Sequence, residues 1–142
     1  MLLSDYAFHH SFRVRWSETD AQGVVFNARY LDYADIAITE YWRAVGLRAL
    51  HPGEPLEFHV ARATVNFRKV IMPDEMIIVA ARTISTGRTS MTQQVAIFGQ
   101  SGDDDLRADI DLVSVHVDLT THRPSPLPGG VAAAFASFDQ RA

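Results

Sequence analysis

Asp20 has the sequence surroundings best suited to chemistry. It lies in the turn-rich passage 17–28, seven residues before Asn27, and Gly23 between them permits a tight or left-handed backbone. Such a turn can bring the carboxylate back toward the helix expected to start at Asn27. Unpaired N–H groups and a partial positive charge at a helix start can hold an oxyanion or polarise a carbonyl. This pairing suits acyl transfer, while a purely structural Asp20 that bonds turn amides is the alternative.

Other chemistry-bearing groups lack a usable pattern. The chain has no Cys, which excludes thiolate nucleophiles, disulfides and Cys-based zinc sites. His9 and His10 are adjacent on an expected strand and so point to opposite faces, and the other histidines lack metal-ligand spacing. The acidic run 103–105 lacks the Gly and Glu of an EF-hand loop, and a solvated hairpin loop is expected there. No serine-hydrolase elbow, P-loop or dinucleotide fingerprint occurs. We expect neither metal nor cofactor.

Length and composition are those of one domain spanning residues 1–142. The 142 residues are 47% hydrophobic, enough for one core, and residues 124–142 form a Pro-rich and then Ala-rich tail. The formal charge of -4 argues against a nucleic-acid partner. Because neither a signal peptide nor a membrane-length apolar run is present, we expect a cytoplasmic protein without a membrane span. Lys69 is the only lysine among 13 basic residues, and arginine suits bidentate phosphate contacts.

Hydrophobic spacing predicts one strand, one long helix and then four more strands. Apolar residues alternate from Phe12 to Trp16, which indicates a half-buried strand. Helical spacing follows from Tyr30 to Val45, with Asn27 as the expected capping residue and Gly46 as the stop, giving a helix of about 19 residues. Four β-rich stretches follow, at 58–67, 76–84, 90–98 and 106–119. A lone amphipathic helix must bury its apolar stripe against a sheet, so an α+β fold is expected.

The segment FRVRWSETDAQGVVFNARYLDYAD resembles the signature of the 4-hydroxybenzoyl-CoA thioesterase-like branch of the hotdog superfamily. The matching positions are Asp20, Gly23, Phe26, Asn27, Ala28 and Tyr30. The likeness continues in VNFRKVIMPDEMIIV, GRTS at 87–90, VHVD at 115–118 and RPSPLP, and so spans about four-fifths of the chain. Asn at position 27 departs from the His or Tyr of many relatives, a difference confined to the side chain.

The resemblance implies a hotdog fold, in which a five- or six-stranded antiparallel sheet wraps around one long central helix. It further implies a homodimer with active sites at the subunit interface, and a dimer of dimers, hence a homotetramer. The implied activity is hydrolysis of acyl-CoA, with a short-chain, medium-chain or aromatic acyl group, to free acid and CoA. Asp20 takes the role of general base or nucleophile, the backbone amide of Asn27 polarises the thioester carbonyl, and Gly23 sets the turn.

Candidate contacts to the acyl-CoA substrate follow from residue type and place. The residues are Phe26, Tyr30, Arg88, Thr89, Ser90, Lys69 and Arg123, with the basic ones expected to contact CoA phosphates. Tyr33 and Tyr41 share the helical spacing of Tyr30 and are more typical of a core. Two alternatives stay open. One is a non-catalytic acyl-CoA-binding hotdog protein; the other is an acyl-thioester hydratase or dehydratase, for which the required His with Asp or Glu is not evident.

Overall fold

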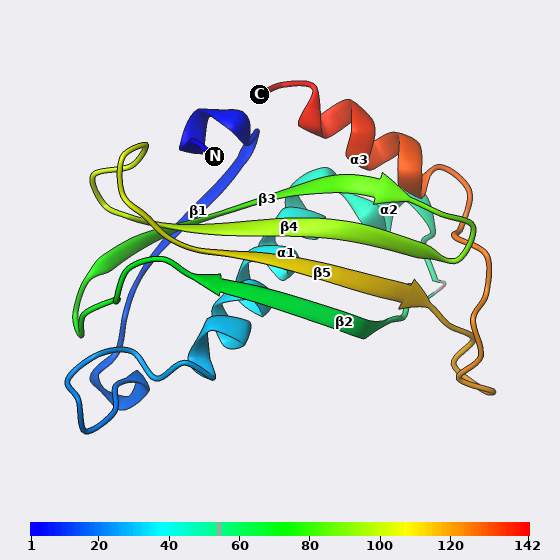
Figure 1. Ribbon diagram of the computed structural model, residues 1–142. Coiled ribbons are helices and arrows are strands. Elements are labelled where there is room, and N and C mark those ends of the chain that lie inside the picture. Colours follow the sequence, from blue (N-terminus) through cyan, green and yellow to red (C-terminus); the bar gives the residue numbers. More distant parts are fainter. Residues whose placement is uncertain (54) are drawn as a thin grey trace.

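The central feature of the fold is a five-stranded antiparallel sheet in the order β1-β3-β4-β5-β2. The computed structural model describes residues 1–53 and 55–142. The strands are β1 (Phe8–Arg13), β2 (Phe58–Phe67), β3 (Met76–Thr86), β4 (Ser90–Gly99) and β5 (Leu106–His116). The helices are α1 (Arg29–Val45), α2 (Leu47–Leu50) and α3 (Val131–Asp139), with 3-10 turns η1 (Leu3–Asp5) and η2 (Trp16–Glu18). Figure 1 shows α1 crossing one face of the sheet and β2 forming one edge of it.

Helix α1 buries one stripe against the sheet. Its buried residues recur every three or four positions and are Tyr30, Tyr33, Ala34, Ala37 and Tyr41. The predicted stop is confirmed, since Gly46 has φ 84° and donates its N–H to the carbonyls of Trp42 and Arg43. The predicted cap is wrong, because the helix begins at Arg29 and no side chain caps it. The carbonyls of Phe26 and Asn27 instead accept the N–H groups of Arg29 and Tyr30 in a tightened first turn.

The later strands lie where the sequence predicts them, within three residues at every end, whereas the first strand lies earlier than predicted. Strand β1 ends at Arg13, and Trp16 belongs to η2 with 69% of its surface exposed. The chain leaves the sheet because the Glu18 carboxylate accepts the N–H of Arg15 and the carbonyl of Trp16 accepts the N–H of Thr19. Val14 continues the buried side of the strand for one more residue.

The layers meet in one main core. Buried side chains of β3, β4 and β5, including Val79, Val95 and Ile110, pack with the buried stripe of α1 and with Phe135 of α3. The Ala-rich tail therefore forms a docked helix. A five-stranded antiparallel sheet around one long helix confirms the hotdog fold that the resemblance implies.

The acidic turn between β4 and β5 is only partly the solvated loop that was expected. Asp103 and Asp104 are exposed, but the side chain of Asp105 is 18% exposed and pairs with Arg107 and Lys69. Asp109, on β5, is buried and bonds to Asn66 and Arg68. Because these carboxylates have basic or amide partners, they stay within the fold.

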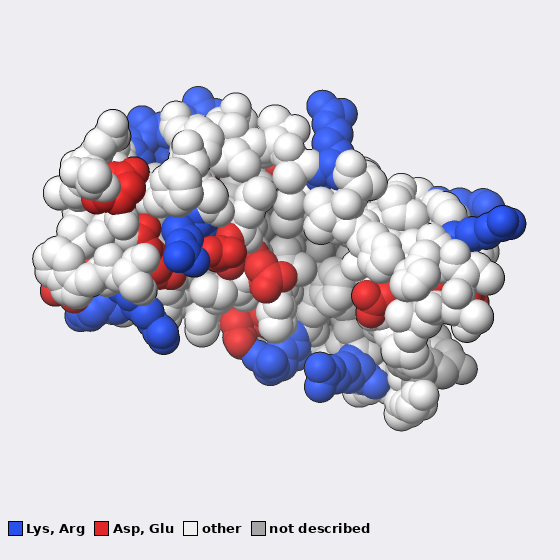
Figure 2. All heavy atoms as spheres, turned by 90° about the horizontal axis from the view of Figure 1, so that it is seen from below, with Lys and Arg blue, Asp and Glu red and all other residues white. Residues whose placement is uncertain are grey.

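The face of the molecule seen from below in Figure 2 is not strongly basic. Figure 2 shows basic and acidic side chains interspersed on the face seen from below, with white areas between them. Within the described part of the chain, no group of three or more His, Cys, Asp or Glu could hold a metal ion. None of the described helices is long and apolar enough to cross a membrane.

Candidate functional site

Asp20 opens a tight backbone reversal. Its N–H donates to the carbonyl of Val24 at 3.0 Å, its carbonyl accepts the N–H of Gly23 at 3.0 Å, and Thr19 bridges to Val25. Gly23 has φ 78°, so the left-handed backbone expected at this glycine is present. One carboxylate oxygen of Asp20, Oδ1, accepts the N–H of Gln22 at 2.8 Å. The turn thus fixes the carboxyl group by one oxygen.

The other carboxylate oxygen of Asp20 has no hydrogen-bond partner among the described residues. Asp20 as a residue is half-buried. A carboxylate held by one oxygen, with the second left free, is placed to accept a proton or to attack an electrophile. Both the structural alternative and the catalytic one therefore describe part of this residue's geometry.

Two backbone amides just ahead of α1 are unpaired among the described residues. The N–H groups of Asn27 and Ala28 donate to no acceptor in the described part of the chain, whereas those of Arg29 and Tyr30 are already bonded. Unpaired amides just ahead of a helix add to its positive end and favour a partial negative charge on a ligand oxygen. The Asn27 amide is therefore free for a carbonyl oxygen.

Asp20 and Asn27 line one surface hollow of about 670 Å³. The turn and helix start form one side of it, with Phe26 47% exposed and Tyr30 buried beneath. The other side is formed by residues 67–70, at the end of β2 and in the segment that follows it. We call this following segment, residues 68–71, the strap. Phe67 packs edge-on against Tyr30, with ring centroids 4.9 Å apart. Four sequence-predicted binding or catalytic positions, together with Lys69, thus meet in one place.

Two basic residues stand on the strap side of the hollow. Lys69 was expected from the sequence, and its Nζ lies 3.6 Å from Asp105 with 58% of the side chain exposed. Arg68 was missed; its Nε bonds the buried Asp109 at 2.8 Å while 52% of its side chain stays exposed. The sequence signal that could have identified Arg68 is its position next to Lys69. That both residues line the hollow follows only from the fold, which places the end of β2 there.

Arg107 holds the strap in place, and the sequence analysis did not single it out. Its guanidinium bonds both oxygens of Asp105, both oxygens of Glu75 and the carbonyl of Val70, over distances of 2.7 to 3.1 Å. Its carbonyl accepts the N–H groups of Arg68 and Lys69. The guanidinium lowers the pKa of Asp105 to about 2 and also lowers the pKa of Glu75. A side chain 11% exposed thus fixes one wall of the hollow.

The strap is also tied to the Asp20 turn. The carbonyl of Ile71 accepts the N–H of Val25 at 2.8 Å, and burial raises the pKa of Tyr30, whose hydroxyl has the Ile71 amide nearby. A neutral Tyr30 hydroxyl is therefore maintained at physiological pH. One backbone hydrogen bond, from Val25 to Ile71, therefore connects the two sides of the hollow.

The other predicted CoA contacts lie at the opposite end of the sheet. Ser90 pairs with Val115 on β5, whose neighbour His116 pairs with the first residue of β2, Phe58. The carbonyl of Arg88 accepts the N–H of Leu127, and the carbonyl of Arg123 accepts that of Asp118. Arg88, Thr89, Ser90 and Arg123 thus share one end of the sheet, and within one chain they do not line the Asp20 hollow.

The remaining helix tyrosines belong to the core. Tyr33 and Tyr41 are fully buried, and burial raises the pKa of each. Tyr33 donates to Glu18 at 3.2 Å, and Tyr41 donates to Asp139 at 2.8 Å. Of the three tyrosines on this stripe, only Tyr30 lines the hollow.

Comparison with known proteins gives a family match over most of the chain. The model of the thioesterase-like superfamily matches residues 14–135, which include the whole Asp20 turn. The acyl-CoA thioesterase YbgC of Haemophilus influenzae is 30% identical over 134 residues, covering 92% of this chain and 96% of that protein.

Solved structures share the fold at lower sequence identity. The PA5185 protein of Pseudomonas aeruginosa superposes with a TM-score of 0.84 at 22% identity, covering 96% of this chain and 94% of that one. A thioesterase of Thermus thermophilus, solved in complex with coenzyme A and zinc, has a TM-score of 0.80 at 24% identity and covers 97% and 98%.

Proposed function

The chain belongs to the thioesterase-like superfamily, and from this premise we propose that it hydrolyses acyl-CoA thioesters with Asp20 as the catalytic carboxylate. One observation carries the proposal: Asp20, which has one carboxylate oxygen free of hydrogen bonds among the described residues, and Asn27, whose amide is unpaired among them, line the same hollow. A hydrolase needs a base or nucleophile on one side of the reacting carbon and hydrogen-bond donors on the carbonyl oxygen. The hollow supplies both kinds of group.

The thioester carbonyl is placed with its oxygen toward the Asn27 amide. In the general-base route, Asp20 removes a proton from water, and the hydroxide forms a bond to the carbonyl carbon. The resulting oxyanion is stabilised by the amide and by the positive end of α1. Collapse breaks the carbon–sulfur bond and releases the thiolate of CoA, which takes up the proton. The products are the free acid and CoA.

In the nucleophilic route, the free oxygen of Asp20 itself attacks the carbonyl carbon. The carbon–sulfur bond breaks with release of the thiolate, and a mixed anhydride with Asp20 remains. Water then cleaves the anhydride and regenerates the carboxylate. Label on Asp20 after a single turnover in ¹⁸O-labelled water identifies the nucleophilic route, because water that attacks the aspartyl carbon of the anhydride leaves its oxygen on the aspartate. The general-base route, and attack on the acyl carbon of the anhydride, label only the released acid.

The substrate's carrier arm is assigned to the basic residues at the two ends of β2. Lys69 and Arg68 line the hollow itself. Arg88, Thr89, Ser90 and Arg123 lie at the far end of the sheet and reach the hollow only from a second chain. We propose a homodimer in which two β2 strands pair antiparallel, because β2 is a ten-residue edge strand whose side chains are mostly exposed, with Val60 61% exposed. Pairing two such dimers gives the proposed tetramer.

The activity itself is tested by free-thiol release from short-chain, medium-chain and aromatic acyl-CoAs. We expect turnover of at least one class. For the preferred class, kcat/KM should reach the range usual for enzymes, about 10⁴ M⁻¹s⁻¹ or more. A folded protein whose melting temperature rises with acyl-CoA but which releases no thiol would contradict hydrolysis and favour the acyl-CoA-binding alternative.

A further inference from the structure

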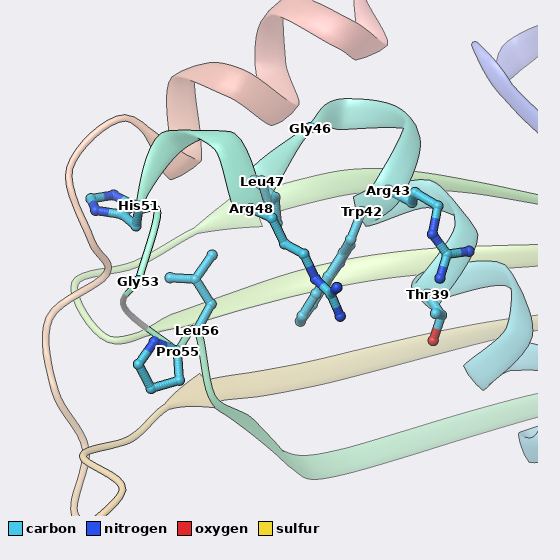
Figure 3. A pocket seen from close by; sticks show the side chains of 10 residues that line it. All are labelled: Thr39, Trp42, Arg43, Gly46, Leu47, Arg48, His51, Gly53, Pro55 and Leu56. Carbon is cyan, nitrogen blue, oxygen red and sulfur yellow. The ribbon is translucent and has the colours of Figure 1, made fainter.

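A second recess lies between the C-terminal half of α1, helix α2 and the segment leading into β2. Its volume is about 680 Å³ (Figure 3). Apolar side chains of Trp42, Leu47 and Leu56 wall it, and polar groups of Thr39, Arg43 and Arg48 stand around them. None of these residues has a part in the chemistry assigned above to the hollow.

The aromatic wall is fixed in place. The indole Nε1 of Trp42 donates to the side-chain Oε1 of Gln93 at 3.0 Å, and Gln93 is 1% exposed. The Gln93 amide donates in turn to the hydroxyl of Thr83 at 3.0 Å. Phe58 packs edge-on against the indole at 5.1 Å. The recess therefore has an aromatic wall whose orientation is fixed by these contacts.

The charges of the recess favour an anion. Figure 3 shows the side chains of Arg43 and Arg48 running down on the same side as Trp42 and Thr39. Arg43 pairs with Glu40 on its own helix, but no carboxylate of the described residues pairs with Arg48. The guanidinium of Arg48, unpaired among the described residues, matches the geometry of a carboxylate.

Within one chain the recess and the Asp20 hollow are far apart. Leu56 comes just before β2 and Phe67 is its last residue, and ten strand residues span roughly 30 Å. If two β2 strands pair antiparallel about their centres, the start of one strand lies beside the end of the other. Each recess then adjoins the hollow of the second chain.

We propose that the recess receives the distal end of the acyl group and that Arg48, assisted by Arg43, selects acyl groups ending in a carboxylate. This inference rests on the proposed thioesterase function and on the β2-paired dimer. The methylene chain of such a substrate lies along Trp42 and Leu56, and its terminal carboxylate meets the guanidinium groups. The substrate class is thus the monothioesters of dicarboxylic acids.

The test compares adipoyl with hexanoyl thioesters, which have the same chain length and differ in the terminal group. Each acyl group is presented on CoA and on N-acetylcysteamine, which lacks phosphates. Wild type is expected to prefer adipoyl by about tenfold or more in kcat/KM on both carriers, and Arg48→Gln to lose that preference while keeping its hexanoyl activity. The control variant Arg141→Gln removes one positive charge near the C-terminus and is expected to keep the adipoyl preference.

Two outcomes overturn the inference while leaving the proposed function intact. One is hydrolysis of hexanoyl-CoA without any adipoyl preference. The other is an Arg48→Gln defect that follows the CoA carrier and not the acyl terminus, which would assign the arginine to CoA phosphates.

A binding measurement separates the inference from the activity. The chain has two tryptophans, so Trp16→Phe leaves Trp42 as the sole tryptophan, whose emission is followed by selective excitation. Adipate is expected to change its emission saturably, with at least tenfold weaker binding after Arg48→Gln. If no thioester is hydrolysed, the proposed function fails, and the adipate titration still decides whether the recess binds a carboxylate. Absence of saturable binding contradicts the recess assignment.

Discussion

At the scale of single residues, Arg107 has more charge-assisted hydrogen bonds than any other side chain near the hollow. We expect Arg107→Gln to lower the free energy of unfolding by about 3 kcal/mol, because it leaves Asp105 and Glu75 without their cation in a partly buried position. Urea unfolding measures the loss, with Arg141→Gln as the control for an exposed arginine. An equal, small effect of both variants would show that the cluster does not stabilise the fold.

The same cluster predicts how stability depends on pH. The pKa of Asp105 is about 2 in the folded chain against an ordinary value of 3.8, so folding favours its ionised form. A depressed carboxyl pKa stabilises the fold above the ordinary value, and this contribution is lost as the pH falls from about 4 to 2. Glu75 contributes in the same direction.

We therefore expect the free energy of unfolding of wild type to fall over this interval more steeply than that of Arg107→Gln. Urea unfolding at pH 4, 3 and 2 measures both slopes. Parallel curves for the two proteins would contradict the assignment of this pH dependence to the cluster.

The residue scale also shows where sequence reasoning stopped. Asp20, Gly23 and Asn27 are neighbours in the chain, so their grouping around a turn and a helix start was predictable from local backbone rules. Arg68 and Arg107 act on the hollow through β-strand pairing between distant segments. The register between distant strands is set by the whole sheet, so it could not be predicted from this single sequence.

At the scale of elements, α1 is positioned by its end more than by its start. Gly46 has a backbone φ of 84°, which residues other than glycine adopt only with strain. We expect Gly46→Ala to lower the free energy of unfolding by about 1 kcal/mol. Gly129→Ala, which has open space and no left-handed backbone, should change it by less than about 0.5 kcal/mol. Thermal unfolding of the two variants provides the comparison, and equal melting temperatures would contradict it.

The order and type of the main elements were predictable because α1 and the strands have strong periodicity. The bounds of β2 were predicted without error, since apolar and polar residues change character at both ends. The first strand was misplaced because Trp16 continues an alternating pattern that the η2 turn interrupts. The prediction of Asn27 as the cap was wrong because backbone carbonyls accept the N–H groups that a capping side chain would otherwise bond.

At the scale of the whole molecule, the residues proposed to contact the substrate divide between two ends of the sheet. If each site combines Asp20 from one chain with Arg88 and Arg123 from the other, two inactive variants should complement one another. We expect Asp20→Asn and the double variant Arg88→Ala with Arg123→Ala to regain activity on mixing, because a mixed dimer contains one complete site. Thiol release before and after subunit exchange measures this effect.

Recovered activity requires a species of at least twice the 15.8 kDa chain, and light scattering measures that mass. Each mixed dimer has one complete and one doubly altered site, so an equal mixture at random exchange should regain about a quarter of wild-type activity, a statistical expectation for a two-fold assembly. A dimer that exchanges subunits without any recovery would show that each site lies within one chain.

The measurement closest to the central claim is acyl-CoA hydrolysis by Asp20→Asn, with Asp32→Asn on the exposed start of α1 as the matched control. The substitution keeps the size of the side chain and removes its charge, so the turn closed by the backbone of Asp20 should persist. We predict that kcat falls by about 10² to 10⁴ for Asp20→Asn if Asp20 is a general base, and by more if it is the nucleophile, while folding and oligomeric state stay unchanged and Asp32→Asn retains activity. Full activity of a folded Asp20→Asn protein would contradict the assignment and require another catalytic group.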